Sequence, residues 1–210
     1  MTKLLVYTHP TLAAYARHAE AAITDWRRIK SPSRFLRWFA AALPPRARVL
    51  DYGCGIGLEL AWLGRQGFRV EGVDGTPAFV MEARRRNPGV PVHEARFETW
   101  PMPAGRPTGT SSGRYDGIWC QAALIHVPPE ELRRQLTKLR QGLMPGGVAG
   151  LTLAWGRARG HTRYDWIPGR YLAAYSKAEA AALFRGWTVR ELRVTSHDGR
   201  QGRWIHILAS

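Results

Sequence analysis

The sequence predicts an α/β fold in which a mostly parallel, seven-stranded sheet ends in an antiparallel hairpin. Three observations predict it. Short apolar runs alternate with helical segments from Arg46 onward, the first run leads into a glycine-rich turn, and the last two runs flank the turn-like pair Asp198-Gly199. A chain of 210 residues is long enough for one domain with a sizeable hydrophobic core.

The first 45 residues are expected to be helical. Apolar and small residues return at helical spacing over Thr11–Lys30, directly after Pro10. The Ser31-Pro32 pair then fits the cap and the first turn of a second helix, which the two prolines at 44 and 45 end. This segment therefore stands apart from the alternating pattern that follows it.

Five apolar runs precede the hairpin, and helices are expected between them because parallel neighbours need crossover connections. The five runs are Val49–Tyr52, Val70–Val73, Val90–Val92, Gly117–Cys120 and Val148–Trp155. The helices are expected near Leu58–Arg65, Pro77–Arg86 and Pro129–Leu143, with a last one opened by the capping box Ser176–Glu179. The hairpin strands are Trp187–Val194 and Trp204–Leu208.

The chain is strongly basic, with 31 Lys+Arg against 16 Asp+Glu and a formal net charge of +15. Such a balance suits an anionic partner, although an arginine-rich composition also produces a solvated basic surface. No apolar run approaches the ~20 residues of a membrane-spanning helix, and residues 1–8 lack the features of a signal peptide. We expect a soluble, cytoplasmic protein that does not bind membranes.

The two cysteines, Cys54 and Cys120, are too few for a disulfide framework or a structural zinc site. The histidines show no metal-ligand spacing. We therefore predict reduced thiols and no bound metal.

The glycine-rich turn is the motif that carries chemistry. Residues 49–57 read VLDYGCGIG, a buried strand running into a turn and then a helix. Alone, this spacing suits either a nucleotide site or merely a tight connection. Asp51 places a carboxylate at the strand end, and Asp74 ends the next apolar run. An acid at the tip of the neighbouring strand can accept hydrogen bonds from both ribose hydroxyls of a bound nucleoside.

With these residues the chain resembles the class I S-adenosylmethionine-dependent methyltransferases, in particular small bacterial methyltransferase-domain proteins. Four motifs occur in the family's order: VLDYGCGIG (49–57), VEGVDGTPAFVMEAR (70–84), YDGIWCQAALIHVPPEEL (115–132) and LMPGGVAGLTLAW (143–155). The resemblance implies a three-layer, Rossmann-like methyltransferase fold. It also implies an N-terminal helical lid over residues 1–45, a cofactor-binding domain over 46–210, and S-adenosylmethionine as the cofactor, with S-adenosylhomocysteine as its product.

The resemblance further implies a cofactor site made of Asp51, Gly53, Cys54, Gly55, Gly57, Asp74, Gly75, Thr76, Arg96, Phe97, Gln121, Ala122 and Tyr15. Asp51 would lie near the ammonium group of the cofactor and Asp74 would hold its ribose. Arg96 stands where many relatives carry an acid that meets adenine, so backbone groups or Phe97 would hold the base. Tyr15 either folds over the cofactor or simply packs within the first helix.

His126 is the candidate catalytic residue. An imidazole titrates near neutral pH and can take a proton from a methyl acceptor. A histidine packed before Pro128 that only shapes the loop explains the sequence equally well.

The loop Gly156–Arg170 follows a strand and carries four arginines against one acid. Arginine grips carboxylates in a planar fork, and tryptophans beside the loop supply flat apolar surface. The residues expected to bind an anionic, planar acceptor are Trp155, Arg157, Arg163, Arg170 and Tyr171. The alternative is a solvated basic loop.

We predict direct methyl transfer to an oxygen, nitrogen or sulfur of a small-molecule acceptor, because nearly all of the chain is spent on the core fold. Two alternatives stay open. The first is non-methyl chemistry on the same cofactor, either aminocarboxypropyl transfer or cyclisation. The second is a basic RNA-binding or RNA-modifying protein on this fold. A monomer or a homodimer is expected.

Overall fold

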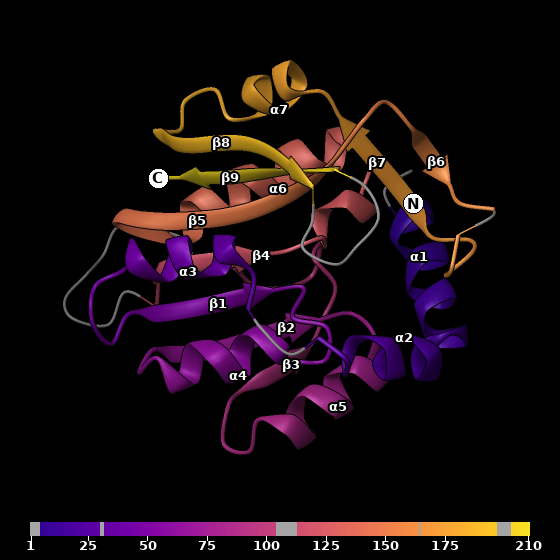
Figure 1. The fold of residues 1–210 in the computed structure, drawn as a ribbon, viewed down its shortest axis with the longest axis horizontal. Helices are drawn as coiled ribbons and strands as arrows, with labels where there is room; N and C mark the ends of the chain where they lie inside the picture. The colour runs from indigo at the N-terminus through magenta and orange to yellow at the C-terminus, as the bar shows by residue number, and fades with distance from the viewer. Residues whose placement is uncertain (1–4, 30–31, 104–112, 164, 197–202) are drawn as a thin grey trace.

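The computed structural model describes residues 5–29, 32–103, 113–163, 165–196 and 203–210. Within these residues seven α-helices and one short 3₁₀ helix surround one nine-stranded sheet (Figure 1). The strands are β1 Arg48–Tyr52, β2 Arg69–Asp74, β3 Val92–Glu94, β4 Tyr115–Cys120, β5 Leu143–Trp155, β6 Arg159–His161, β7 Tyr171–Tyr175, β8 Val189–Ser196 and β9 Arg203–Ala209. The helices are α1 Leu5–Arg17, α2 Ala19–Trp26, α3 Arg34–Ala41, α4 Leu58–Arg65, α5 Pro77–Arg86, η1 Leu124–His126, α6 Pro129–Gly142 and α7 Lys177–Leu183.

The sheet confirms the predicted α/β architecture. Strands β3, β2, β1, β4 and β5 lie side by side and pair in parallel, with Val49 of β1 opposite both Val70 and Gly117. The last strand, β9, then pairs antiparallel with both β5 and β8. The predicted C-terminal hairpin is therefore present, while the pair proposed as its turn lies outside the described residues.

Two strands were not expected. Strand β7 pairs in parallel with the carboxyl end of β5, where Ala154 lies opposite Ala174, and β6 pairs antiparallel with β7. Only three residues form β6, an Arg-Gly-His sequence without apolar alternation, so periodicity gives no signal for it. Strand β3 also begins two residues later than predicted, at Val92.

Alternation along the strands divides the core between the two faces of the sheet. On one face the buried cluster joins α3 and α4 to the sheet through Phe35, Phe39, Leu63, Val49, Trp119 and Val148. On the other face α6 packs through Leu132, Leu136, Leu139, Leu50, Ile118 and Leu151. Figure 1 shows α3 in front of the sheet and α6 behind it, which gives the predicted three layers.

The N-terminal segment differs from the prediction in its boundaries. The first helix, α1, begins at Leu5, so Pro10 lies inside it rather than before it. The expected single helix breaks at His18, whose ψ of 18° leaves the helical region, and α2 follows. The cap of α3 is Ser33, whose Oγ accepts a hydrogen bond from the Leu36 amide at 3.1 Å; the predicted cap, Ser31, lies outside the described residues.

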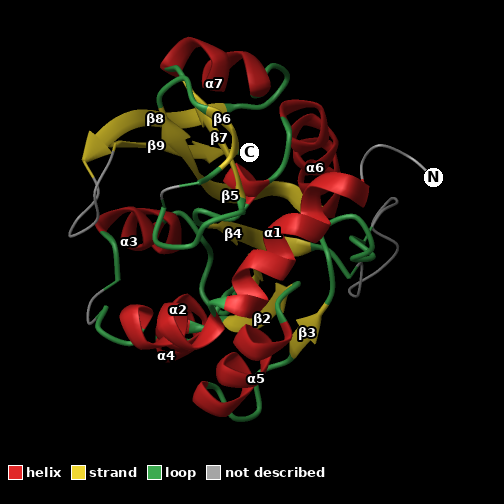
Figure 2. Cartoon of the chain, turned by 90° about the vertical axis from the view of Figure 1, so that its right-hand side faces the viewer, coloured by secondary structure: helices red, strands yellow, loops and turns green. Residues whose placement is uncertain are grey.

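Only part of residues 1–45 is placed to act as a lid. Helix α3 belongs to the core of the sheet face. Helices α1 and α2 instead contact β7 and α5, and Figure 2 shows α1 crossing the edge of the sheet. In the described part of the chain, every helix is too short or too polar to cross a bilayer.

Candidate active site

A cavity of about 820 Å³ opens at the carboxyl ends of the parallel strands. The segments that follow β1, β2 and β4 form one wall, and residues of α1 and α2 form the opposite wall. Open α/β sheets bind their ligands at this edge because the loops there converge from neighbouring strands. The cavity is therefore the candidate active site.

Most of the residues predicted for the site line this cavity: Tyr15, Asp51, Gly53, Cys54, Gly55, Asp74, Gly75, Thr76, Arg96, Phe97, Gln121, Ala122, His126, Trp155, Arg157 and Arg170. Three predicted residues lie outside its wall. Gly57 is buried beside Ala83 and Asn87 at the start of α4, Arg163 is exposed, and Tyr171 is a core residue of β7.

The glycine turn brings the ends of β1 and β2 together. The amides of Gly53 and Cys54 both donate to the carbonyl of Val73, at 2.8 and 3.0 Å. Gly53 has a φ of +85°, and a Cβ at this position would lie 2.4 Å from the Cβ of Ala123. Only glycine allows both this conformation and this close approach.

The Asp74 carboxylate links the two turns that form this wall. One oxygen accepts from the Gly55 amide at 3.0 Å and the other from the Thr76 amide at 2.8 Å. Thr76 was predicted to cap α5 with its side chain, but that side chain makes no cap hydrogen bond; the carboxylate of Asp74 binds the backbone there instead.

The wall carries buried negative charge. Asp51 is 2% exposed, and its Oδ2 has no hydrogen-bond partner among the described residues. Burial, followed by the nearby carboxylates of Glu59 and Asp74, raises the pKa of Asp51 well above its usual range. Burial also raises the pKa of Asp74. The cavity therefore favours a ligand that presents a cationic group to Asp51.

A segment after β4 supplies the opposite end of this wall. Ala122 adopts a left-handed φ of +53°, which costs energy for a residue with a Cβ. Its amide donates to Thr152 Oγ1 at 2.7 Å, a contact that helps to hold the strained turn. The turn leads into η1, which carries His126.

His126 is the centre of a buried hydrogen-bond chain. Its Nδ1 lies 2.7 Å from the carbonyl oxygen of Tyr171, and its Nε2 lies 2.8 Å from the hydroxyl of Tyr15. Arg170 donates from Nη1 to the same hydroxyl at 3.0 Å, and its Nε donates to Asp165 at 2.9 Å. Residues from α1, η1 and β7 thus meet in one network.

The environment of His126 keeps its ring neutral. Burial, with a further contribution from the positive charge of Arg170, lowers the pKa of His126 to about 4. A ring that is neutral at pH 7 and donates from Nδ1 to a carbonyl must have a free electron pair on Nε2. His126 is therefore a hydrogen-bond acceptor for Tyr15.

This lowered pKa predicts an acid-sensitive fold. An unfolded chain protonates His126 as pH falls through 6.5, whereas the native chain does so only near pH 4. Between pH 7 and pH 4.5 the native state should thus lose about 2 kcal/mol from this group alone. Denaturant unfolding of the parent and of His126→Gln at both pH values measures the difference, since other titrating groups, including Asp165, are common to both. Equal losses in the two proteins would refute the prediction.

Aromatic side chains form the lid wall. Tyr15 and Trp26 pack on Phe79 of α5, with ring centroids 5.5 and 4.9 Å apart. Trp26 also meets Trp166 edge-on at 6.1 Å. An ion pair adds to this packing, because Arg27 of α2 reaches the buried Glu82 of α5 at 2.9 Å. Trp26 and Phe79 were missed by sequence reasoning, since apolar residues at helical spacing predict ordinary core packing.

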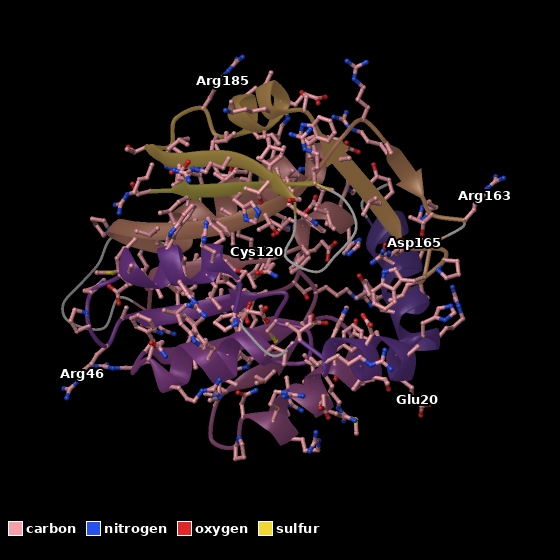
Figure 3. All side chains as sticks on the ribbon, viewed as in Figure 1. Glu20, Arg46, Cys120, Arg163, Asp165 and Arg185 are labelled. Carbon is pink, nitrogen blue, oxygen red and sulfur yellow. The ribbon has the colours of Figure 1, made fainter. Side chains whose placement is uncertain are left out.

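The arginine-rich loop is only partly committed to the cavity. Arg157 and the half-exposed Trp155 line it, and Arg203 of β9 lies over the Trp155 ring at 4.2 Å. Arg203 was not predicted, because nothing local marks the first residue of an edge hairpin. Arg170 is held by Asp165, and Arg163 projects outward from the molecule (Figure 3).

The two cysteines are buried free thiols, and Figure 3 shows Cys120 within the molecule. Burial raises the pKa of both thiols. Because the thiolate is the reactive form, these environments favour packing over nucleophilic chemistry.

Comparisons with known proteins point in one direction. A family described as "Methyltransferase domain" matches residues 49–147. The thiopurine S-methyltransferase of Pseudomonas entomophila (strain L48) is 30% identical, with 74% of this chain and 73% of that protein covered. The corresponding protein of Pseudomonas putida (strain GB-1) is 29% identical, with coverages of 75% and 74%.

The fold also matches a solved structure. The 1,6-didemethyltoxoflavin-N1-methyltransferase of Burkholderia thailandensis superimposes with a TM-score of 0.74 at 19% identity, covering 100% of this chain and 90% of that one. At this identity the match concerns the arrangement of strands and helices.

Proposed function

The chain belongs to the class I S-adenosylmethionine-dependent methyltransferases, and from this premise we propose that it transfers a methyl group directly to a small-molecule acceptor bound in the cavity. The two thiopurine S-methyltransferases and the toxoflavin-pathway enzyme are named for small heterocyclic acceptors. The cavity volume lies near the upper end of the range for small-molecule sites, which supports a space shared by two ligands.

One observation carries the proposal, namely the unpaired, buried carboxylate of Asp51. S-adenosylmethionine has an α-ammonium group, and an ammonium is the partner that a carboxylate in this environment lacks. Glu59 also lines the cavity and adds to the negative potential at Asp51. The donor set of this chain therefore fits the amino-acid end of the cofactor.

The remaining groups fit the nucleoside end. Each Asp74 oxygen accepts one backbone hydrogen bond, and a carboxylate oxygen has a second electron pair that a ribose hydroxyl can use. Phe97 packs on Tyr52 with ring centroids 4.5 Å apart and lines the cavity, so it offers a flat surface to a base. The cofactor supplies a methyl group on a positively charged sulfur; the protein supplies position and a water-poor cavity.

For the acceptor we propose a planar, anionic molecule held at the outer end of the cavity. Trp155 and Trp166 are 42% and 47% exposed there, and large exposed rings are surfaces that a planar ligand can cover. Arg157 and Arg203 line the same end and can bind a carboxylate or a phosphate. Arg170 is excluded from this role because Asp165 and Tyr15 occupy its guanidinium.

Calorimetry with S-adenosylhomocysteine tests the cofactor site, and mass spectrometry of the product tests the reaction. Methyl transfer produces S-adenosylhomocysteine and an acceptor that is heavier by one methylene. Absence of binding by the folded protein would contradict the proposal. A different sulfur product would point to aminocarboxypropyl transfer or cyclisation.

The anionic end of the acceptor is tested by single substitutions. We expect Arg157→Gln and Arg203→Gln each to raise the KM of an anionic acceptor about tenfold, as expected for the loss of one charge-assisted hydrogen bond. Affinity for S-adenosylhomocysteine should not change. Arg163→Gln is the matched control, since Arg163 lies in the same loop but outside the cavity. Parent-like KM values in both variants would remove the arginines from the site.

A further inference from the structure

The hydroxyl of Tyr15 has one hydrogen-bonding position that no described residue uses. We propose that this position accepts a hydrogen bond from an N–H or O–H group on the nucleophilic atom of the methyl acceptor. The inference rests on the proposed function and adds the chemical class of the acceptor atom. It also assigns Tyr15 to the acceptor, whereas the sequence alone suggested the cofactor.

The direction of the first hydrogen bond is fixed by a carbonyl. The oxygen of Tyr171 can only accept, so the proton of the neutral His126 ring must lie on Nδ1. The Nε2 atom is then an acceptor, and the Tyr15 hydroxyl must donate its single hydrogen to it across 2.8 Å. Tyr15 has no second hydrogen to offer a ligand.

Arg170 uses the second position. A guanidinium carries donors only, so its Nη1 donates to Tyr15 at 3.0 Å. Asp165 binds the guanidinium from the other side, and the Arg170 side chain is only 11% exposed. The arginine is therefore held against the tyrosine rather than free to turn toward a ligand.

One electron pair of the phenol oxygen remains, and the ligand space lies beside it. Tyr15 lines the cavity, while its ring is packed against Trp26, Phe79 and the His126 ring. Burial raises the pKa of Tyr15, so the hydroxyl stays neutral and acts as an acceptor rather than as a base. A ligand must then bring the hydrogen.

This arrangement orients a nucleophile without deprotonating it. An acceptor that donates its hydrogen to Tyr15 directs its electron pair elsewhere in the cavity. That electron pair forms the new bond to the methyl carbon while the carbon–sulfur pair returns to sulfur, and the acceptor's proton is released to solvent after transfer. Alignment of this kind is a recognised source of rate enhancement.

Paired ligands test the proposal by calorimetry on the protein loaded with S-adenosylhomocysteine. The pairs are 4-aminobenzoate with 4-dimethylaminobenzoate and 4-hydroxybenzoate with 4-methoxybenzoate. We expect the member that carries hydrogen to bind at least about tenfold more tightly in the parent, as for one buried hydrogen bond. Tyr15→Phe should abolish this preference while leaving affinity for S-adenosylhomocysteine unchanged.

Tyr175→Phe is the matched control, because the Tyr175 hydroxyl is buried without a partner among the described residues and lies outside the cavity wall. It should keep the preference. Equal affinities within both pairs in the parent, including no measurable binding of any member, would overturn the proposal. A preference that persists in Tyr15→Phe would assign it to steric exclusion of the added methyl groups and overturn the proposal as well.

A second measurement does not depend on any variant folding. The nitrogen-15 NMR spectrum of His126 at neutral pH should show a proton on Nδ1 and none on Nε2. A proton on Nε2 would reverse the direction of the Tyr15 hydrogen bond and overturn the inference. Failure of the proposed function is distinguishable, because it would appear as a folded parent that does not bind S-adenosylhomocysteine.

Discussion

Asp51→Asn should weaken the binding of S-adenosylhomocysteine about 100-fold, which corresponds to about 3 kcal/mol. The substitution keeps the shape of a side chain that is 2% exposed and removes only its charge. The same change should raise the free energy of unfolding of the ligand-free protein at pH 7, because the native state no longer has to bury an unpaired carboxylate beside Glu59 and Asp74. Calorimetry and denaturant unfolding measure the two effects.

Opposite signs for affinity and stability distinguish a binding residue from a structural one. Glu71→Gln is the matched control, because Glu71 is a carboxylate of β2 that pairs with Arg48 at 2.7 Å and lies outside the cavity wall. It should leave affinity unchanged and slightly lower stability. If Asp51→Asn bound S-adenosylhomocysteine as tightly as the parent, Asp51 would have no place in the cofactor site.

Gly53→Ala should destabilise the protein by about 3–5 kcal/mol. Part of the cost is the left-handed φ of +85°, about 1–2 kcal/mol for a residue with a Cβ. The larger part is overlap, because the new methyl group would lie 2.4 Å from the Cβ of Ala123 and 3.3 Å from the ring of Phe97. Overpacking of this kind typically costs about 1–3 kcal/mol. Denaturant unfolding measures the sum.

Two further variants separate these contributions. Ala123→Gly removes the overlapping methyl group, so the double variant should recover most of the overlap cost but none of the backbone cost. Gly67→Ala isolates the backbone cost, since Gly67 has a φ of +86° with nothing within 4 Å of an added Cβ. Equal costs for Gly53→Ala and Gly67→Ala would show that contact with Ala123 contributes nothing.

Local patterns predicted the parts of the molecule that depend on neighbours in sequence. Alternation of apolar runs with helical segments predicted the parallel order, and β1, β2 and β4 pair as expected. The glycine turn with Asp51 and Asp74 was predicted because strand ends in a parallel sheet share one edge, and both carboxylates line the cavity.

Partners that are distant in sequence could not be predicted in the same way. Tyr15, His126 and Arg170 were each singled out, but 111 and 155 residues separate Tyr15 from the other two, and no pattern indicates that they touch. Arg157, Arg163 and Arg170 have the same side chain and the same loop, yet one lines the cavity, one is exposed and one is paired with Asp165. Composition cannot distinguish such positions, because burial and pairing are decided by the folded environment.

The contact between Tyr15 and Arg170 also sets an order of events during protein synthesis. Helix α1 leaves the ribosome first, but its partners on β7 are made 155 residues later, roughly 8–30 s at about 5–20 residues per second. Through that interval the apolar faces of α1 and α2 lack the neighbours that bury them. The first helices to be made are thus the last to dock, and a nascent chain that stops short of residue 165 carries the glycine turn and Asp74 but not the residues that close the site around Tyr15.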